Sequence, residues 1–177
     1  MNSYSEIPDN LTIDWLFSSD RTAAERVPDH HWCEDGQAII YDANLPHSVR
    51  TFELVDPVSL TRRPLLDMRK SLTSLSQHLG ESEIPAVLGW PLEFSRQGDK
   101  ALYYFNDDIY LLNLREADFI RITQTVEKDT CARFSPDGEK IAYVSGNNIF
   151  VYHISEKRTL QLTGDGSENI LNGRLSW

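Results

Sequence analysis

Cysteine is scarce in this chain of 177 residues, which contains only Cys33 and Cys131. Two cysteines make no disulfide framework, and their spacing matches no zinc site. Basic residues are also few, because 17 Lys and Arg face 27 Asp and Glu, for a formal net charge of −10. Nucleic acids and anionic membranes require clustered Lys and Arg, so this balance argues against both as partners.

Long hydrophobic runs and catalytic motifs are missing as well. No stretch of the sequence approaches membrane-spanning length. The start, Met1 to Asn10, is polar without a basic region leading into an apolar run, so the sequence predicts no signal peptide and a cytoplasmic location. A periplasmic location is the alternative if the N-terminus is incomplete. No Gly-x-Ser-x-Gly elbow is present, so no hydrolase nucleophile is placed by motif.

Candidate metal ligands are weak. His31 and Cys33 would share one face of a strand, but neighbours on one strand rarely complete a tetrahedral site. The acidic pair Asp107 and Asp108, and residues 165–168, lack the alternating ligands and distal Glu of a calcium loop. We interpret all of these as turn-forming or turn-flanking residues. The sequence therefore predicts no metal and no cofactor.

A repeat of about forty residues organises the rest of the chain. Phe134 follows Phe94 by 40 residues, and Ile149 follows Ile109 by the same interval. Each copy has an aromatic residue, a Gly-containing turn and then strands rich in Ile, Val, Tyr and Phe. Weaker copies begin at Trp32 and, near the end of the sequence, at Trp177. The structural repeat positions are Trp32, Asp35, Gly36, Phe94, Gly98, Phe134, Pro136, Asp137, Gly138 and Trp177.

Repeats of this length, each a four-strand meander, are typical of propeller blades. We therefore predict an all-β fold, a partial β-propeller of about three four-stranded antiparallel blades with a helical insertion. Known propellers close with roughly four to eight blades, so about three leave unpaired edges and apolar faces, which favours association into a homo-oligomer. Because an aromatic residue buries a large area, we expect the aromatic repeat positions to pack in the core.

The predicted layout begins with a connector, 1–26, that carries a short helix at Leu11 to Phe17. A partial propeller over 27–177 follows, with blades at 27–66, 86–123 and 130–163 and a further blade or substrate-binding segment starting at 164–177. The helical insertion is placed at 66–80, because five apolar residues recur at intervals of three and four between Leu65 and Leu79. Gly80 is expected to end this helix as a left-handed cap.

Two segments carry a resemblance to known families. Phe134 to Val144 resembles the repeat of WD-like propellers, which include the TolB type and the N-terminal domains of prolyl oligopeptidase relatives. Leu162 to Gly173, followed by Trp177, closely resembles the segment of dipeptidyl peptidase IV-like enzymes that leads from a propeller strand into the substrate-binding helix. The resemblance extends from about Leu11 to Trp177.

This resemblance implies a serine exopeptidase that releases dipeptides from peptide N-termini. In that family the propeller gates and lines the substrate cavity, and a C-terminal α/β-hydrolase domain carries a Ser-Asp-His triad. A glutamate pair that binds the substrate's α-amino group would follow Trp177, and the turn Asn106-Asp107-Asp108 lacks the arginine that some members use to orient the substrate. We therefore expect no catalytic and no substrate-binding residue in this chain. The implied partners are a peptide substrate and the protein's own hydrolase domain.

Two other interpretations stay open. A stand-alone TolB-like or WD-like propeller would use its rim as a protein-binding module, and it would add blades without a hydrolase domain. A truncated or pseudogene product would have no activity at all.

Overall fold

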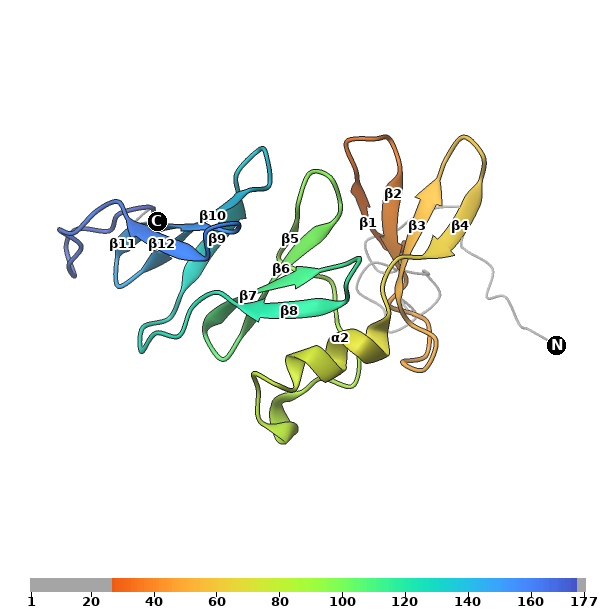
Figure 1. The fold of residues 1–177 in the computed structure, drawn as a ribbon, viewed down its shortest axis with the longest axis horizontal. Coiled ribbons are helices and arrows are strands. Elements are labelled where there is room, and N and C mark those ends of the chain that lie inside the picture. The colour runs from red at the N-terminus through yellow and green to blue at the C-terminus, as the bar shows by residue number, and fades with distance from the viewer. Residues whose placement is uncertain (1–26, 175–177) are drawn as a thin grey trace, which may run out of the picture.

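Three four-stranded antiparallel sheets make up the part of the chain that the computed structural model describes, residues 27–174 (Figure 1). In each sheet, successive strands are hydrogen-bonded neighbours, which confirms an all-β partial propeller. The predicted connector with its short helix, and Trp177, lie outside the described residues.

Blade 1 contains β1 (Asp29–Trp32), β2 (Ala38–Tyr41), β3 (Phe52–Asp56) and β4 (Thr61–Pro64). Blade 2 contains β5 (Glu93–Phe94), β6 (Lys100–Phe105), β7 (Asp108–Asn113) and β8 (Asp118–Arg121). Blade 3 contains β9 (Thr130–Phe134), β10 (Lys140–Ser145), β11 (Asn148–His153) and β12 (Arg158–Gln161).

The backbone repeats in register through all three blades. The first hairpin turn of each blade has a glycine at positive φ, with values of 82° at Gly36, 70° at Gly98 and 71° at Gly138. Glycine adopts this conformation without a steric penalty, which explains its recurrence at this position. The turn between the third and fourth strands places a non-glycine residue at positive φ in each blade: Leu60, Ala117 and Lys157. The three sheets are therefore copies of one supersecondary unit.

Two hydrophobic clusters lie between neighbouring blades. The first joins blades 1 and 2 and includes Phe52, Phe94 and Leu112. The second joins blades 2 and 3 and includes Leu102 and Ile141. The middle strands of blade 2 are buried on both faces because each face packs against an adjacent layer, as their nearly continuous apolar sequence predicts.

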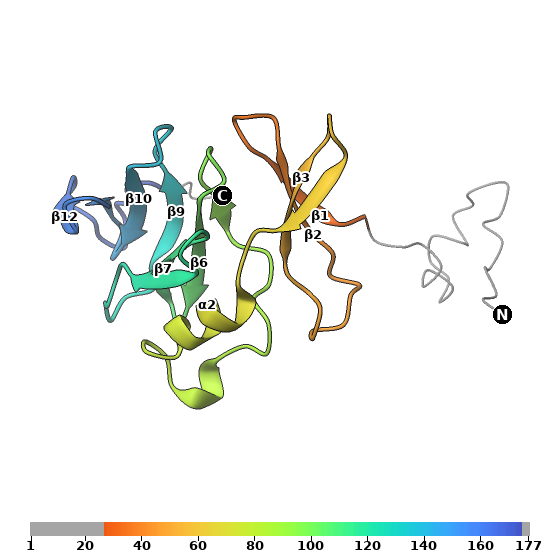
Figure 2. The ribbon, with the colours of Figure 1, turned by 45° about the vertical axis from the view of Figure 1, so that its right-hand side comes forward.

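The insertion between blades 1 and 2 contains a helix, α2 (Met68–Leu75), and a 3-10 turn, η2 (Glu81–Glu83). Asp67 caps α2 by accepting a hydrogen bond from the Lys70 backbone N–H at 2.9 Å. The helix covers the outer strand of blade 2, because the Ser74 hydroxyl donates to Asp118 at 2.6 Å and accepts from the Phe119 N–H at 2.9 Å (Figures 1 and 2). None of the helices within residues 27–174 is long and apolar enough to cross a membrane.

This helix is shorter than the apolar pattern predicts. Leu65 belongs to the blade instead, because its N–H donates to the carbonyl of Phe52 at 2.8 Å. At the other end the helix stops at Ser76, whose N–H still donates to Leu72. The expected left-handed cap at Gly80 is wrong, since its φ is −64° and it precedes η2. Leu79 keeps the helical spacing but is buried in the first cluster from a turn.

The three outer strands are protected from edge-to-edge pairing in different ways. In blade 2, α2 covers β8. In blade 1, all four residues of the edge strand β4 are exposed, and they include Arg62, Arg63 and Pro64. Charged side chains and proline both disfavour the addition of another strand. The edge strand β12 of blade 3 is also exposed, and Arg158 stands at its start.

Trp32 corrects the expectation that every aromatic repeat position packs in the core. Phe94 is 5% exposed, whereas Trp32 is 60% exposed in the described part of the chain. The equivalent residue of each blade faces the preceding blade: Phe94 packs on Phe52 of blade 1, and Phe134 packs in the cluster between blades 2 and 3. Within residues 27–174 no sheet lies on that side of blade 1, so Trp32 has no neighbour to cover it.

Candidate functional site

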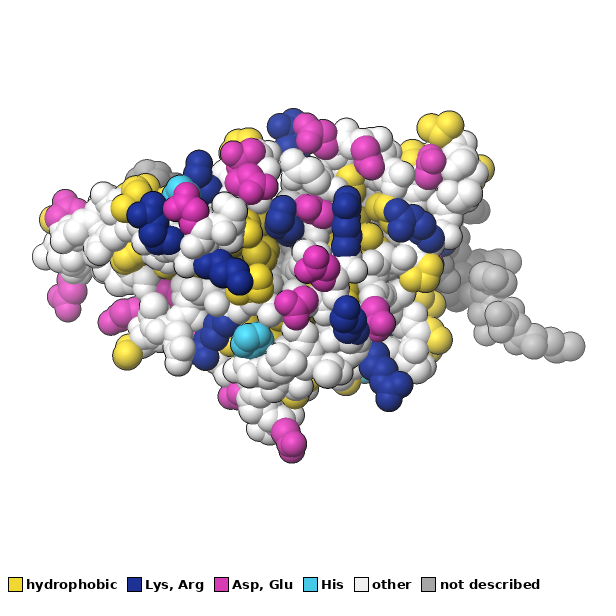
Figure 3. Space-filling view, viewed as in Figure 1, with side chains coloured by type: hydrophobic (Ala, Val, Ile, Leu, Met, Phe, Trp, Pro, Cys, Tyr) yellow, Lys and Arg dark blue, Asp and Glu magenta, His cyan; other side chains and the backbone are white. Residues whose placement is uncertain are grey.

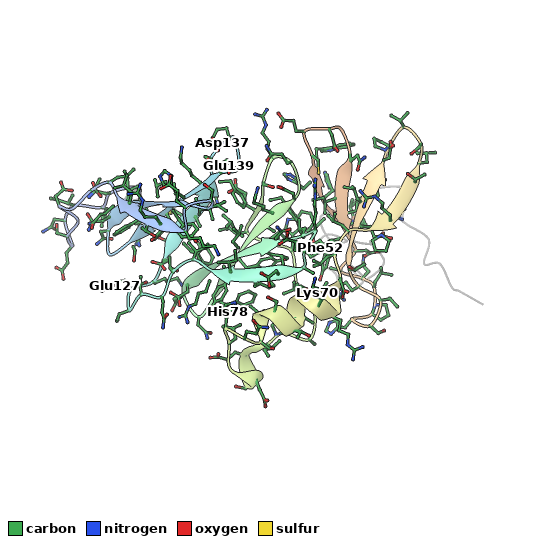
Figure 4. All side chains as sticks on the ribbon, in the orientation of Figure 1. Phe52, Lys70, His78, Glu127, Asp137 and Glu139 are labelled. Carbon is green, nitrogen blue, oxygen red and sulfur yellow. The ribbon has the colours of Figure 1, made fainter. Side chains whose placement is uncertain are left out.

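The blades present two opposite rims. One, the turn rim, carries the first hairpin turn of each blade, at residues 33–37, 95–99 and 135–139. The other, the connection rim, carries the turns at 105–108 and 145–148 and the connections at 122–129 and 162–173. Figure 4 labels Asp137 and Glu139 on the turn rim and Glu127 on the connection rim. The repeat positions that the structure describes, which are all of them except Trp177, therefore lie at or next to one rim, away from the segments that join the blades.

On the turn rim, each predicted aspartate holds its own turn. Asp35 accepts a hydrogen bond from the Gln37 N–H at 3.0 Å, and Asp137 accepts one from the Glu139 N–H at 3.0 Å. The Ser135 hydroxyl also donates to Asp137, and this bond is the main cause that lowers the pKa of that carboxyl. These contacts are typical of turns and place no carboxylate in a cavity with a second acid.

The turn glycines also bring neighbouring blades into contact. A Cβ atom at Gly98 would lie 2.3 Å from Cys33 Sγ of blade 1, and one at Gly138 would lie 2.9 Å from Gln97 Oε1 of blade 2. Gly98 is thus required twice, for its positive φ and for its close approach to the buried Cys33, whereas Gly138 is required for its positive φ, because Gln97 Oε1 ends a flexible side chain that can move aside. The turns of successive blades stack along this rim.

His31 and Cys33 serve packing between blades 1 and 2. The His31 ring lies on Phe94, with ring centroids 5.1 Å apart, and burial lowers the pKa of His31. Cys33 is buried, and this burial raises the pKa of its thiol. Across residues 27–174, no group of three His, Cys, Asp or Glu side chains is placed to hold a metal ion. His31 and Cys33 therefore both pack at the interface between blades 1 and 2.

The connection rim contains a buried polar centre at Asp108 in blade 2. Asp108 is 3% exposed and forms an ion pair with Arg121, whose Nε lies 3.1 Å from Oδ2. The Thr123 hydroxyl donates to Asp108 Oδ1 at 3.3 Å and accepts from the Ile109 N–H at 2.8 Å. The Thr125 N–H donates to the same Oδ1 at 3.1 Å. One side chain therefore ties the end of blade 2 to the connection that leads into blade 3.

Blade 3 repeats this polar centre with neutral residues. Asn148 stands at the position of Asp108, and its Oδ1 accepts from the Thr163 hydroxyl at 3.2 Å and the Gly166 N–H at 2.9 Å. The Thr163 hydroxyl accepts from the Ile149 N–H at 2.9 Å, as Thr123 does in blade 2. Gln161 replaces Arg121 and donates to the Thr163 carbonyl at 2.7 Å. The same turn thus holds the chain leaving blade 3.

Residues 164–173 bend back over the hairpin turn of blade 3. The Asn172 N–H donates to the Asn147 carbonyl at 3.1 Å. A Cβ at Gly166 would lie 2.5 Å from that carbonyl oxygen, and one at Gly173, where φ is 73°, would lie 2.6 Å from Val144. The segment that resembles the approach to a substrate-binding helix is therefore fixed against the blade by two close glycine contacts.

Replacing Gly166 by alanine should release this segment. The new methyl group collides with a backbone carbonyl that cannot rotate away, so the bonds from Gly166 and Asn172 should weaken while the blades stay folded. Amide hydrogen exchange of residues 166–172 should become roughly tenfold or more faster. Gly164→Ala is the matched control, since its Cβ would lie 3.9 Å from the nearest atom, in Gln161. Equal exchange in the two variants would contradict the proposed anchoring.

The connection rim is rich in exposed carboxylates. Asp107 pairs with Lys128 at 3.2 Å, and both side chains are largely exposed. Glu127, Asp165 and Glu168 are also exposed on this rim. Asp165 accepts a hydrogen bond from the Asn172 side chain at 3.0 Å, which is the turn chemistry expected for it. This rim can attract and position a cationic group, but the described residues give it no nucleophile with a base.

Sequence reasoning missed the polar centre on this rim. The sequence pattern predicts turn chemistry for Asp107 and Asp108 together, but Asp108 is buried whereas Asp107 is exposed. The signal was present in the repeat: Asp108 and Asn148 are 40 residues apart, as are Thr123 and Thr163. A polar pair that recurs in register between apolar strands indicates a shared hydrogen-bonding role.

Comparisons with known proteins agree with this architecture. Residues 94–177 match the family model described as the dipeptidyl peptidase IV (DPP IV) N-terminal region. The chain is 31% identical over 172 residues to a probable dipeptidyl peptidase 4 of Neosartorya fischeri, covering 96% of this chain and 19% of that protein. Prolyl endopeptidase FAP of Bos taurus is 33% identical over 76 residues, covering 42% of this chain and 10% of that protein.

A solved structure shows the same fold. The crystal structure of Porphyromonas gingivalis dipeptidyl peptidase 4 superposes with a TM-score of 0.57 at 18% identity, covering 82% of this chain and 21% of that one. At this identity the likeness concerns the arrangement of the blades. The chain spans about a fifth of the length of the Neosartorya relative and of this structure.

Proposed function

The chain is an N-terminal propeller region of the dipeptidyl peptidase IV type, and on this premise we propose that it forms one wall of the substrate cavity of a serine exopeptidase. This enzyme releases dipeptides from the N-termini of peptides. Its catalytic residues belong to an α/β-hydrolase domain outside these 177 residues. The blades gate access to the cavity, and their partners are the peptide substrate and that hydrolase domain.

The observation that carries this proposal is the 31% identity to a probable dipeptidyl peptidase 4 over 96% of the chain. An alignment of this extent runs through all three blades and the helical insertion, not through one repeat. The acidic connection rim adds physical support, because carboxylates favour the approach of a peptide's terminal ammonium group. The segment 164–173, anchored on the same rim, leads toward the position that the resemblance gives to the amine-binding glutamates.

The reading frame beyond Trp177 tests the proposal. We expect a Glu-Glu pair soon after Trp177 and a Gly-x-Ser-x-Gly motif several hundred residues later. The full-length product should then hydrolyse Gly-Pro-p-nitroanilide, and replacing the motif serine by alanine should abolish this activity. A reading frame that adds only further blades and then stops would instead indicate a protein-binding propeller.

The 177-residue chain alone should show no turnover of Gly-Pro-p-nitroanilide. It has no Gly-x-Ser-x-Gly elbow to position a nucleophilic serine. The measurement is release of p-nitroaniline over several hours, with circular dichroism to establish that the chain is folded. Steady hydrolysis that survives a serine-directed inhibitor and repeated purification would contradict the assignment of catalysis to another domain.

A further inference from the structure

A cavity of about 390 Å³ lies between blades 1 and 2 on the turn rim. Blade 1 contributes Cys33 and Leu54 to its wall, and Gly98 closes it from blade 2. The close approach of Gly98 to Cys33 holds the two blades together on one side of this space. Its volume falls in the range of small-molecule sites. The cavity lies at the opposite end of the blades from the connection rim.

Two arginines from different blades line this cavity. Arg63 lies on β4 of blade 1, and Arg115 lies in the turn between β7 and β8 of blade 2. Among the described residues, neither guanidinium group has an ion pair or a hydrogen-bond partner. The neighbouring Arg62 differs, because it pairs with Glu53 at 3.1 Å on the other face of β4. Arg96 and Arg121 are paired as well.

An unpaired guanidinium has five N–H donors in a planar fork that matches a carboxylate or a phosphate. The guanidinium groups of Arg63 and Arg115 supply such donors to the cavity from blade 1 and from blade 2. Gln37 and Gln97 add amide groups to the lining, and Asp35 adds one carboxylate beside them. The buried Cys33 thiol adds no negative charge, since burial raises its pKa. The charged groups of the lining therefore leave an excess of one positive charge in a chain of net charge −10.

We propose that this cavity, between Arg63 of blade 1 and Arg115 of blade 2, binds a small ligand through an oxyanion, either a carboxylate or a phosphate. The oxyanion receives charge-assisted hydrogen bonds from both guanidinium groups. Asp35 is available to accept a hydrogen bond from a hydroxyl or ammonium group of the same ligand. Elsewhere on the visible surface, basic and acidic side chains are interspersed (Figure 3), so a large polyanion finds no extended basic face there.

Such a ligand would also join the two blades. Its oxyanion would bridge an outer strand of blade 1 and a turn of blade 2. Elsewhere the two blades meet through the apolar cluster, the backbone bond from the Glu34 N–H to the Arg96 carbonyl at 2.9 Å, and the ion pair between the same two residues. Binding should therefore stabilise the interface between these blades. All the residues that line the cavity belong to blades 1 and 2 of this chain. Ligand binding can therefore be tested whether or not the longer protein is a peptidase.

The test is a titration of the ¹⁵N-labelled chain, followed by the backbone amides and the arginine Nε–H signals. Sodium phosphate and sodium succinate serve as separate probes, at constant ionic strength because salt screens exposed charges. We expect saturable shifts at Arg63, Arg115 and Gly98, with a roughly millimolar dissociation constant. The probe that binds more tightly distinguishes a phosphate ligand from a carboxylate ligand. No saturable shift with either probe would overturn the proposal.

Matched variants locate the binding. Arg63→Gln and Arg115→Gln should each weaken binding about tenfold, because each removes one charged fork. Arg63→Lys should give an intermediate loss, since it keeps the charge but not the fork. Arg62→Gln is the control and should leave the affinity unchanged. All of these side chains are exposed, so the variants should fold, and circular dichroism verifies this. An equal loss in Arg62→Gln would show binding by general surface charge and would refute the site.

Discussion

Replacing Phe52 with alanine should lower the free energy of unfolding by about 3–5 kcal/mol. Phe52 begins the third strand of blade 1 (Figure 4), and its side chain is fully buried. Its ring contacts three aromatic rings, at centroid distances of 4.9 Å to Tyr41, 6.1 Å to Trp90 and 5.8 Å to Phe94. Only Tyr41 belongs to the same blade. The substitution therefore opens a cavity at the junction of two blades and the connection between them.

The surrounding structure has little freedom to close this cavity. Tyr41 is held by the hydrogen bond from its hydroxyl to the Leu88 carbonyl at 2.8 Å, and Phe94 is fixed in the ladder opposite Ala101. When neighbours cannot relax, the cost of a large-to-small substitution approaches the upper end of its range. Urea denaturation of the chain, followed by circular dichroism, measures the change in free energy.

Val58→Ala provides the control for Phe52. Val58 is 92% exposed in the turn after β3, so its truncation should change the free energy of unfolding by less than about 0.5 kcal/mol. A loss below about 1 kcal/mol for Phe52→Ala would show that the junction between blades 1 and 2 is loosely packed. That outcome would remove the basis for treating the three blades as one continuous structure.

The sequence predicted the repeat because the repeat is local. Turn glycines such as Gly98 and Gly138 and the strands that follow them depend on neighbouring residues, and these positions keep their spacing in the chain. The contacts across the blades are not local. Glu93 accepts the Phe134 N–H at 2.8 Å, and the Tyr104 hydroxyl accepts the Ala132 N–H at 2.9 Å, which no periodicity indicates. Such contacts are fixed by the angle between adjacent sheets.

Trp32 and the insertion show where the repeat misleads. Trp32 occupies a repeat position that is predicted to lie in the core. Its burial requires a sheet next to the first strand of blade 1, and residues 27–174 do not provide one. The apolar spacing from Leu65 to Leu79 is helical, but the Leu65 N–H donates to the Phe52 carbonyl of blade 1 instead of joining the helix. The spacing of apolar residues identifies the buried face of a helix. The tertiary contacts at the ends of the helix determine where it begins and stops.

The same limit applies to the two regions with functional interest. On the connection rim, the repeat marks Asp108 and Thr123 as positions that recur in register, but the contacts of Asp108 with Thr123 and Thr125 are tertiary and appear only in the structure. The cavity on the turn rim depends on Arg63 and Arg115, which are 52 residues apart and belong to no motif. Polar groups with long-range partners lie beyond the reach of local patterns, although an in-register repeat narrows the search.

Replacing the charged residues Asp108 and Arg121 of blade 2 by the neutral residues found in blade 3 should leave the free energy of unfolding nearly unchanged. Each single replacement, in contrast, should lower it. Arg121→Gln alone leaves the buried Asp108 carboxylate without its cation, and we expect a loss of about 2 kcal/mol in the free energy of unfolding. Asp108→Asn alone removes the partner of a guanidinium that is partly exposed, so about 1–2 kcal/mol is expected. Both values are measured by urea denaturation.

The double variant Asp108→Asn/Arg121→Gln should come within about 1 kcal/mol of the original chain, because blade 3 already contains this arrangement with Asn148 and Gln161. The asparagine oxygen can still accept from Thr125, and the glutamine amide can still donate to the Thr123 carbonyl. The exposed pair Asp107 and Lys128 is the control, for which the coupling should be at most about 0.5 kcal/mol. If the double variant instead loses the sum of the single losses, the two polar centres are not equivalent, and the repeat does not extend to side-chain hydrogen bonding.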